Sequence, residues 1–290
     1  MAKVYEIITD QIVKKLSEGD VPWHKPWQGG DSPRNLVSGK PYRGINVFLL
    51  ALQPYASTYW LSFKQCKARG GNVKKGEKGS MICFYKTVKG ERENKKGEKE
   101  STTFPLLRYY YVFNVEQCEG VEYPKPVFKE PGERIAECER VVEGMPQKPE
   151  LKFEEQRAFY NPNFDFVNMP KYESFGKVEE YYSTLFHELA HSTGHDTRLK
   201  RKNFSCNFFG DHNYSHEELV AEMTAAFLCG RTGIERVTLD NSAAYIKSWT
   251  GKIKADPKLI ITTASQAQKA ADFIINVKKE VENGSGNTNG

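Results

Sequence analysis

YYSTLFHELAHSTGH, residues 181–195, is the stretch around which the chain is organised. Its histidines His187 and His191 are four positions apart, so on an α-helix they lie one turn apart on the same face and can bind one metal ion. Glu188 projects near the open coordination position, where a carboxylate can take a proton from water. This is the HExxH spacing of zinc hydrolases. Aromatic and apolar residues upstream favour a buried helix over two solvated histidines: Tyr181, Tyr182, Leu185 and Phe186.

A zinc centre needs at least one further protein ligand. The longer motif HExxHxxGxxH would supply it from the same segment. Gly194 occupies the required position, but Thr197 stands where the third His belongs, and His195 comes two residues early. The third ligand therefore has to come from another part of the chain.

A better source of the third ligand is the segment 214–228, YSHEELVAEMTAAFL. Ser215 can act as a helix N-cap with Glu218 at the capping-box position, and Glu218 and Glu222 then share one helix face. Small residues on this helix allow close packing: Ala221, Ala225 and Ala226. The segment resembles the gluzincin layout, in which a helix bearing ExxAE follows HExxH. That resemblance implies that Glu218 is the third ligand and that Glu222 orients a ligating His. Glu217 is the alternative ligand, and a solvated helix face is the alternative role.

The composition predicts hydrophobic cores and no membrane span. The 290 residues are 39% hydrophobic and 12% aromatic, which is enough for two domains. No apolar run approaches the length of a membrane span, and the first residues lack a signal-peptide core, so we expect a cytoplasmic protein without membrane contact. The six cysteines are scattered without a CxxC pair, which argues against a disulfide scaffold and for reduced thiols.

Charge is distributed unevenly along the chain. Residues 1–125 contain 21 Lys and Arg against 13 Asp and Glu, a net charge of +8, whereas residues 126–290 carry −3. A basic half joined to a mildly acidic half suggests that the basic half has a polyanionic partner. The basic balance also disfavours an inhibitor that mimics DNA, because mimicry requires an acidic surface.

The basic half also interleaves aromatic and cationic side chains, which is what single-stranded nucleic-acid binding requires. Asn46 is expected at the head of a helix, where free N–H groups suit a phosphate. The other candidate contacts are two loop tryptophans and the residues of two basic turns: Trp23, Trp27, Lys40, Tyr42, Arg43, Lys74, Lys75 and Lys78. For any single ring, a place in the core is the alternative.

Periodicity and turn residues predict the elements of each half. In the basic half we expect helices over 3–18, near 45–53 and over 60–69, a strand over 81–85, a charged mobile loop over 86–103 and an aromatic strand after it. A Pro-rich linker over 121–132 marks a domain boundary, so we expect residues 1–125 to fold alone. Beyond it we expect a short hairpin within 157–170 and helices at about 132–144, 177–193, 215–230, 240–253 and 257–281.

With both halves considered, the chain resembles the ArdC family of antirestriction proteins from mobile genetic elements. The motifs that carry the likeness are PW at 26–27, KPYRGIN at 40–46, VKKGEKG at 73–79, YVFNVEQCEG at 111–120, MP at 169–170, HELAHSTGH followed by Arg198 and Arg201, and EELVAE at 217–222. The chain departs mildly from the family pattern at Ser192, because in the family an aromatic residue often follows the second His.

The resemblance implies an α+β protein with two domains. A small basic α+β domain, residues 1–125, would bind single-stranded DNA, and a mainly helical zincin-like domain of the gluzincin type with a short β-sheet, residues 126–282, would be a metallopeptidase. Residues 283–290 are expected to be a disordered tail. The family function is to protect incoming DNA from restriction during transfer. Zn²⁺ is the expected cofactor, and imidazole and carboxylate ligands also admit Mn²⁺, Co²⁺ or Ni²⁺.

Three functions remain open from the sequence. The first joins DNA binding to an active peptidase acting on a protein or peptide, with the restriction machinery as one candidate substrate. The second is a DNA-binding protein whose zincin domain is structural or binds a partner, and the third is a metallopeptidase whose basic domain binds something else. Glu188 favours the first function over the second, because a structural zinc has no use for a general base. Several residues are candidates to stabilise an oxyanion: Tyr160, His195, His212, Tyr214 and His216.

Overall fold

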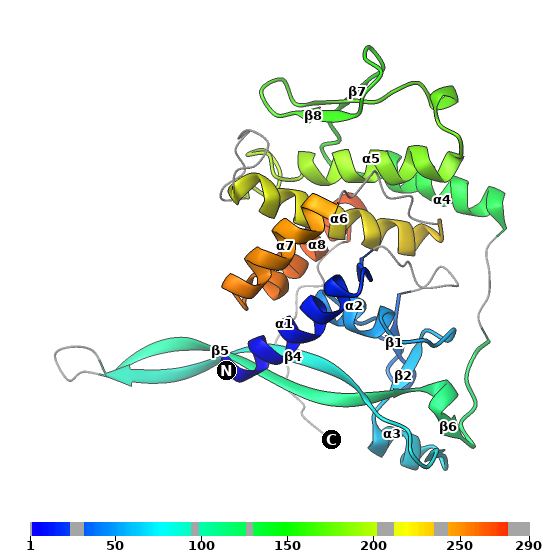
Figure 1. The fold of residues 1–290 in the computed structure, drawn as a ribbon, viewed down its shortest axis with the longest axis vertical. Coiled ribbons are helices and arrows are strands. Elements are labelled where there is room, and N and C mark those ends of the chain that lie inside the picture. Colours follow the sequence, from blue (N-terminus) through cyan, green and yellow to red (C-terminus); the bar gives the residue numbers. More distant parts are fainter. Residues whose placement is uncertain are drawn as a thin grey trace.

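The computed structural model describes residues 2–23, 32–93, 99–125, 130–201, 212–234 and 243–277. Side chains are described over 4–23, 32–84, 107–125, 130–201, 216–234 and 246–277. The protein is α+β, as expected, with the strands and short helices of the first half below and the long helices of the second half above in Figure 1. No helix among these residues has both the length and the apolar character of a membrane span.

The first half is built around a long β-hairpin. Its helices are α1 (Ala2–Ser17), α2 (Ile45–Ala51) and α3 (Phe63–Ala68), and its strands are β1 (Arg34–Asn35), β2 (Tyr59–Leu61), β3 (Asn72–Val73), β4 (Ser80–Glu93), β5 (Lys99–Asn114) and β6 (Cys118–Glu119). One sheet has the order β1-β2-β5-β4, and β3 pairs with β6. The predicted helices are confirmed, except that 59–61 is a strand that leads into α3 rather than its first turn.

The hairpin strands are longer than predicted: residues 86–93 and 99–103 are strand rather than loop, and residues 94–98 lie outside the described part of the chain. Strands β4 and β5 stay in register from Ser80 opposite Val112 to Glu93 opposite Lys99, and they project to one side of the molecule (Figure 1). A two-stranded ladder satisfies its backbone hydrogen bonds without apolar residues. The register continues to the end of the described strands, where Arg92 is opposite Glu100.

The second half consists of five helices and one small sheet among the described residues. The helices are α4 (Pro131–Glu143), α5 (Val178–Ser192), α6 (His212–Thr232), α7 (Ala243–Ala255) and α8 (Leu259–Ile274). The strands are β7 (Glu150–Lys152), β8 (Phe159–Asn161) and β9 (Phe166–Asn168), in the order β7-β9-β8. The predicted helices and the predicted hairpin are confirmed, with ends that differ by a few residues except for α8, which ends at Ile274. The sheet lies over α5 (Figure 1), so β8 is an edge strand next to that helix.

The two halves share one hydrophobic core. The ring of Phe48 on α2 stacks on Phe227 of α6 with centroids 4.8 Å apart, and Trp23 meets Trp249 of α7 edge-on at 5.7 Å. Polar contacts cross the same boundary, such as the Thr9 hydroxyl donating to the Pro257 carbonyl at 3.0 Å. A cut near residue 125 would expose these rings, so the structure does not support the expectation that residues 1–125 fold alone.

Candidate metal centre

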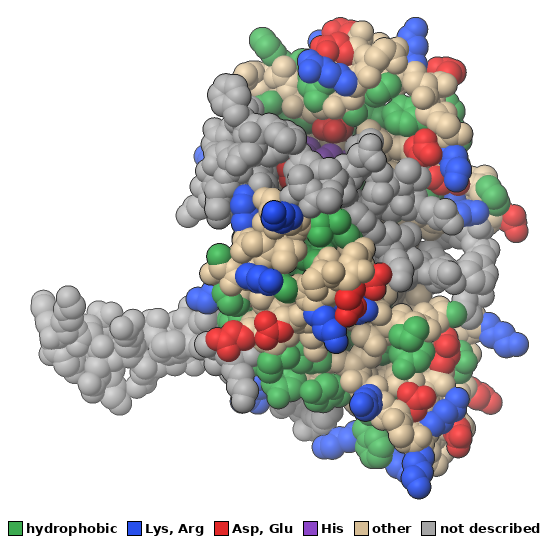
Figure 2. Space-filling view, viewed as in Figure 1, with side chains coloured by type: hydrophobic (Ala, Val, Ile, Leu, Met, Phe, Trp, Pro, Cys, Tyr) green, Lys and Arg blue, Asp and Glu red, His purple; other side chains and the backbone are tan. Residues whose placement is uncertain are grey.

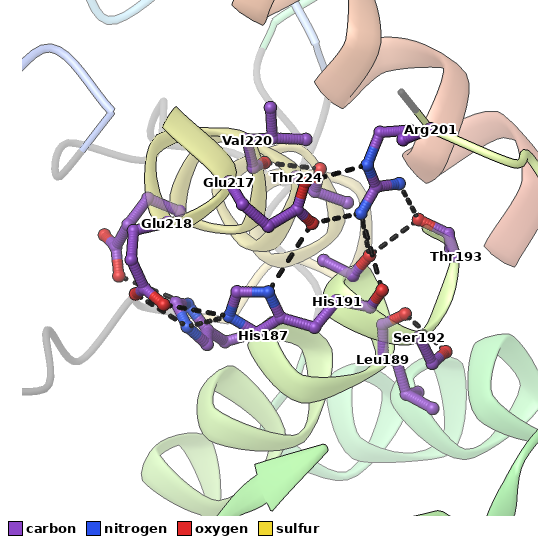
Figure 3. A network of polar contacts seen from close by, with 12 residues as sticks. His187, Leu189, His191, Ser192, Thr193, Arg201, Glu217, Glu218, Val220 and Thr224 are labelled. Carbon is purple, nitrogen blue, oxygen red and sulfur yellow. Dashed lines mark hydrogen bonds and ion pairs between the residues drawn. The ribbon is translucent and has the colours of Figure 1, made fainter. Parts of the chain in front are cut away.

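Helix α5 places the two motif histidines side by side, and α6 brings a carboxylate to them. The Nε2 atoms of His187 and His191 lie 3.0 Å apart. Glu218 Oε1 is 3.3 Å from His191 Nε2, and its Oε2 is 3.5 Å from His187 Nε2. Within the described part of the chain, these three side chains form the group of His, Cys, Asp or Glu suited to hold a metal ion. Figure 3 shows them converging from the two helices.

The donor set fits a divalent ion. A tetrahedral ion bound at about 2.0–2.1 Å keeps its donor atoms about 3.3 Å apart. The two Nε2 atoms are 3.0 Å apart and each lies 3.3–3.5 Å from one of the two Glu218 oxygens, so all of these separations are close to that value. Two imidazole nitrogens and one carboxylate leave a further position open, as in catalytic rather than structural zinc sites.

The field around the histidines favours a positive charge. Burial alone would lower the pKa of His191, but the carboxylates of Glu218 and Glu217 outweigh it and raise the pKa to about 9. Burial also opposes protonation of His187, yet Glu218 and Glu222 hold its pKa well above the ordinary value. The site therefore attracts protons or a metal cation, and the two compete for the same nitrogens.

Each histidine has a carboxylate behind it. Glu222 Oε1 lies 3.2 Å from His187 Nδ1, and Glu217 Oε1 lies 3.5 Å from His191 Nδ1. A carboxylate that accepts from Nδ1–H favours the tautomer that leaves Nε2 free for a metal, and both carboxylates lie close enough for this role, although His187 Nδ1 makes no well-aligned hydrogen bond with any described residue. Glu222 thus lies where an orienting residue is expected, and Glu217, the alternative ligand, faces the other nitrogen of His191 instead of the ligand cluster.

Arg201 holds Glu217 in place, and sequence reasoning gave Arg201 no such role. Its Nε donates to Glu217 Oε2 at 3.0 Å, and its Nη2 pairs with Oε1 of the same carboxylate. The guanidinium also donates to the Ala190 carbonyl at 3.0 Å and to the Thr193 hydroxyl, so it closes the end of α5 onto α6 (Figure 3). Partial burial would raise the pKa of Glu217, but the guanidinium holds it below its ordinary value.

Glu188 is buried beside the histidines. Burial raises its pKa, against the opposing charge of His187 and His191 and a hydrogen bond from the Tyr160 backbone N–H on β8. In Figure 2, His and acidic side-chain atoms are visible in a recess below the upper part of the molecule, where the β7–β9 sheet lies. A carboxyl group with a raised pKa next to a metal-ligand cluster has the properties of a general base.

The structure shows which contacts the candidates for oxyanion stabilisation make. The Tyr160 hydroxyl donates to Asp165 Oδ1 at 2.8 Å, and His195 Nδ1 lies 2.9 Å from the Thr197 hydroxyl. His216 is half-buried on α6, whereas the side chains of His212 and Tyr214 lie outside the described residues.

Three predicted DNA contacts are wrong or already engaged in the protein. Trp23 is 1% exposed and fills the shared core, so it cannot stack on a base. The side-chain amide of Asn46 is bonded to both the N–H and the C=O of Cys83 at 2.8 Å, so this side chain is already engaged, and a phosphate contact by the backbone N–H groups at the start of α2 stays a prediction. The Arg43 guanidinium is already paired with Asp272 of α8, although the Arg43 side chain is 53% exposed. Trp27 lies outside the described residues.

The remaining predicted contacts are on the surface. Lys40, Lys75 and Lys78 are exposed, and Tyr42 is half-buried near Lys40. Lys74 is also exposed, although its Nζ donates to the Glu116 carbonyl at 2.9 Å.

The sequence did not single out the rings that are exposed. Tyr109, Tyr110 and Tyr111 on β5 are 43–54% exposed, and Phe63 is 51% exposed. The sequence feature that could have predicted their exposure is the run of three consecutive aromatic residues in one strand. Because side chains alternate across a strand, such a run places rings on both faces, and an edge-like hairpin has little core to bury them.

Two family models match different parts of the chain. The model of the N-terminal domain of the anti-restriction factor ArdC matches residues 2–113, and a model of zincin-like metallopeptidases matches residues 137–266. The two matches cover the basic half and the half that holds the metal-ligand cluster.

Similar proteins cover most of the chain. The ArdC protein of plasmid R388 is 36% identical, and its metal-free crystal structure matches with a TM-score of 0.75 over 93% of this chain and 96% of that one. A second structure of the same protein, with Mn(II) bound, matches equally well. Protein y4eC of Sinorhizobium fredii is 31% identical over 93% of this chain and 91% of its own length. The DNA primase TraC of Escherichia coli is 33% identical, but this chain spans 27% of it, about a quarter of its length.

Proposed function

The chain belongs to the ArdC family of antirestriction proteins, and we propose that it protects transferred DNA by joining single-stranded DNA binding to a metal-dependent peptidase centre. The observation that carries the peptidase part is the position of Glu188. It is a buried carboxyl with a raised pKa beside His187, His191 and Glu218, where a structural metal would have no use for it.

The residues divide the chemistry of peptide hydrolysis between them. A divalent ion, proposed to be Zn²⁺, would be held by His187, His191 and Glu218 and would supply Lewis acidity toward the scissile carbonyl. Glu188 takes the proton from the attacking water and passes it to the leaving amine, and its raised pKa brings it closer to neutral pH for both transfers. Glu222 keeps His187 in the tautomer that binds through Nε2.

The substrate is proposed to be an extended peptide that pairs with β8. This strand is the edge of the β7-β9-β8 sheet, and the backbone of Tyr160 within it already donates to Glu188. A segment added to that edge would run past the general base. A protein of the restriction machinery is one candidate for the source of this peptide.

The test is a DNA-protection assay in restricting cells that compares the wild type with Glu188→Gln. We expect the variant to keep its metal and fold but to lose protection, because Gln cannot accept the proton. Glu173→Gln is the matched control, since Glu173 is an exposed carboxylate outside the site. Equal protection by Glu188→Gln with metal retained would assign the centre to a structural or partner-binding role instead.

The DNA-binding part of the proposal rests on the exposed rings and cations of the first half. Tyr109 and Tyr111 lie edge to face at 6.0 Å on one side of β5, and Phe63 lies 6.4 Å from Phe113 on the same side. Gly79 packs so closely on this row that a Cβ there would lie 2.9 Å from the Tyr111 Cβ. The row is therefore adjacent to the Lys-rich turn that precedes Gly79, and it combines stacking platforms with phosphate contacts.

Binding of single-stranded and duplex oligonucleotides, measured across a salt series, tests this part. We expect single strands to bind more tightly, with a slope of about −0.7 in log affinity against log salt for each phosphate neutralised. Lys75→Gln and Lys78→Gln should each reduce that slope. Affinity that does not depend on salt would refute the assignment. The division into residues 1–125 and 126–282 is retained as a proposal about which stretch of sequence carries which activity.

A further inference from the structure

An open cavity with a mixed polar and apolar lining is on the other face of β5, away from the aromatic row. It has a volume of about 320 Å³ and is lined by β1 and the turn after it, the start of α3, and β5. The residues that matter for its chemistry are Asn35, Lys40, Tyr42, Ser62, Gln65 and Tyr110. Its volume is at the lower end of the roughly 300–1,000 Å³ typical of ligand pockets, so it suits one small ring system.

The amides at the floor of the cavity are held in one orientation. Asn35 Nδ2 donates to Gln65 Oε1 at 3.0 Å, and Gln65 Nε2 donates to Asn35 Oδ1 at 3.3 Å. The same two oxygens accept backbone N–H groups, from Ser62 at 2.8 Å and from Ser38 at 3.0 Å. Because a backbone N–H can only donate, the oxygens cannot be exchanged with the amide nitrogens.

This arrangement consumes the acceptors of the cavity and leaves donors. Among the described residues, the second N–H of Gln65 and the hydroxyl hydrogen of Tyr42 have no acceptor, and Lys40 adds an exposed ammonium at the rim. Burial raises the pKa of Tyr42 to about 12, so its hydroxyl keeps that hydrogen at neutral pH. The cavity is therefore suited to a ligand that presents oxygen or nitrogen acceptors.

One wall of the cavity is a ring that a flat ligand can stack on. Tyr110 is 45% exposed, and Val112 follows it on the same face of β5. Its neighbours Tyr109 and Tyr111 point to the opposite face, because side chains alternate along a strand. Tyr110 is thus the exposed tyrosine of this run that contributes to the cavity.

We propose that this cavity binds one unpaired base of single-stranded DNA and that it prefers thymine over adenine. The base would stack on Tyr110, one of its carbonyl oxygens would accept from both Tyr42 and Gln65, and the adjacent phosphate would lie near Lys40. A thymine carbonyl has two lone pairs and can meet both donors while the N3–H points away from them. Adenine has no carbonyl, and its acceptors N1 and N7 both adjoin the exocyclic amine, which would bring a donor against the donors of the cavity. The inference rests on the proposed single-stranded DNA binding and names the site that reads the base.

Fluorescence anisotropy of the full chain with labelled oligo-dT and oligo-dA tests the inference. We expect wild type to bind oligo-dT about tenfold more tightly, the effect of one hydrogen bond. Tyr42→Phe, which removes only the hydroxyl, should bring the two affinities close together by weakening oligo-dT. Tyr110→Leu should weaken both and abolish the preference. Tyr109→Leu removes a similarly exposed ring of the proposed stacking row on the opposite face, so it should weaken both oligonucleotides by the same factor and preserve the preference. Thermal melting of each variant checks the fold.

The outcomes separate the base pocket from DNA binding as a whole. If wild type binds both oligonucleotides and neither Tyr42→Phe nor Tyr110→Leu changes its preference, the proposed base pocket is refuted and the proposed function stands. Equal affinity of wild type for oligo-dT and oligo-dA would overturn the pocket in the same way. Wild type that binds neither oligonucleotide would overturn both.

Discussion

Arg201→Met is the substitution whose effect follows most directly from the structure. The Arg201 side chain is 7% exposed and its partner Glu217 is 14% exposed, so the ion pair is nearly buried. Removing the guanidinium leaves the Glu217 carboxylate with only the His191 imidazole, at 3.5 Å, as a cationic neighbour, so the cost should approach that of breaking a buried pair, about 3–5 kcal/mol. The variant also loses the donors to Ala190 and Thr193 that close the end of α5.

The assay is urea denaturation of the protein with metal removed by a chelator, so that metal binding adds nothing to the measured free energy of unfolding. Arg157→Met is the matched control. Arg157 is 71% exposed in its pair with Glu155, and an exposed pair contributes about 0–1 kcal/mol.

A double-mutant cycle with Glu217→Gln identifies the cause. If the cost comes from the orphaned carboxylate, the free energy lost by Arg201→Met and Glu217→Gln together should be smaller than the sum of the two single losses, by about 1.5 kcal/mol or more. A loss below about 1 kcal/mol for Arg201→Met, or strictly additive losses, would refute the reasoning.

Three further predictions concern the metal, pH and the shared core. His187→Ala should strip metal from the purified protein, whereas Glu217→Ala should only weaken its retention; metal analysis by mass spectrometry would contradict the ligand set if Glu217→Ala alone emptied the site. Partial burial would raise the pKa of Asp165, but Arg198 holds it below the ordinary value. Asp165 therefore contributes stability above pH of about 4 that is lost as the pH falls through its lower folded pKa, so wild type should lose more stability than Asp165→Asn between about pH 5 and pH 2 in urea titrations. Trp23→Ala should lower the unfolding free energy by about 3–5 kcal/mol without changing DNA affinity, and weakened DNA binding by the folded variant would contradict its place in the core.

The residues that could be predicted from sequence are those whose geometry is local. His187, Glu188 and His191 are fixed relative to one another by one turn of helix, so their spacing alone indicates the site. Predicting Glu218 as a ligand also required the resemblance to gluzincins, because nothing in the sequence of α6 indicates which of its faces contacts α5. Arg201 belongs to no helix or strand, and its partner lies 16 residues away, so no periodicity could mark it.

Burial was harder to predict than secondary structure, since it depends on distant segments. Trp23 is covered by Trp249, far away in the sequence, and nothing near Trp23 distinguishes it from a ring that stacks on DNA. The opposite error affected the hairpin, where the absence of apolar residues over 86–103 suggested a loop. The backbone ladder continues these strands in register, and a backbone ladder leaves no mark in a hydrophobic pattern.

The shared core determines how the two activities can be separated experimentally. Phe48 stacks on Phe227, on the helix that carries Glu218, and Arg43 pairs with Asp272 on α8. Deleting either half would expose this interface, so loss of activity in a fragment would report unfolding as readily as a missing site. Substitutions that keep the core intact avoid this ambiguity. Glu188→Gln and Tyr42→Phe each remove one functional group without removing packed volume, so together they can show whether the metal centre and the base pocket act independently within one folded unit.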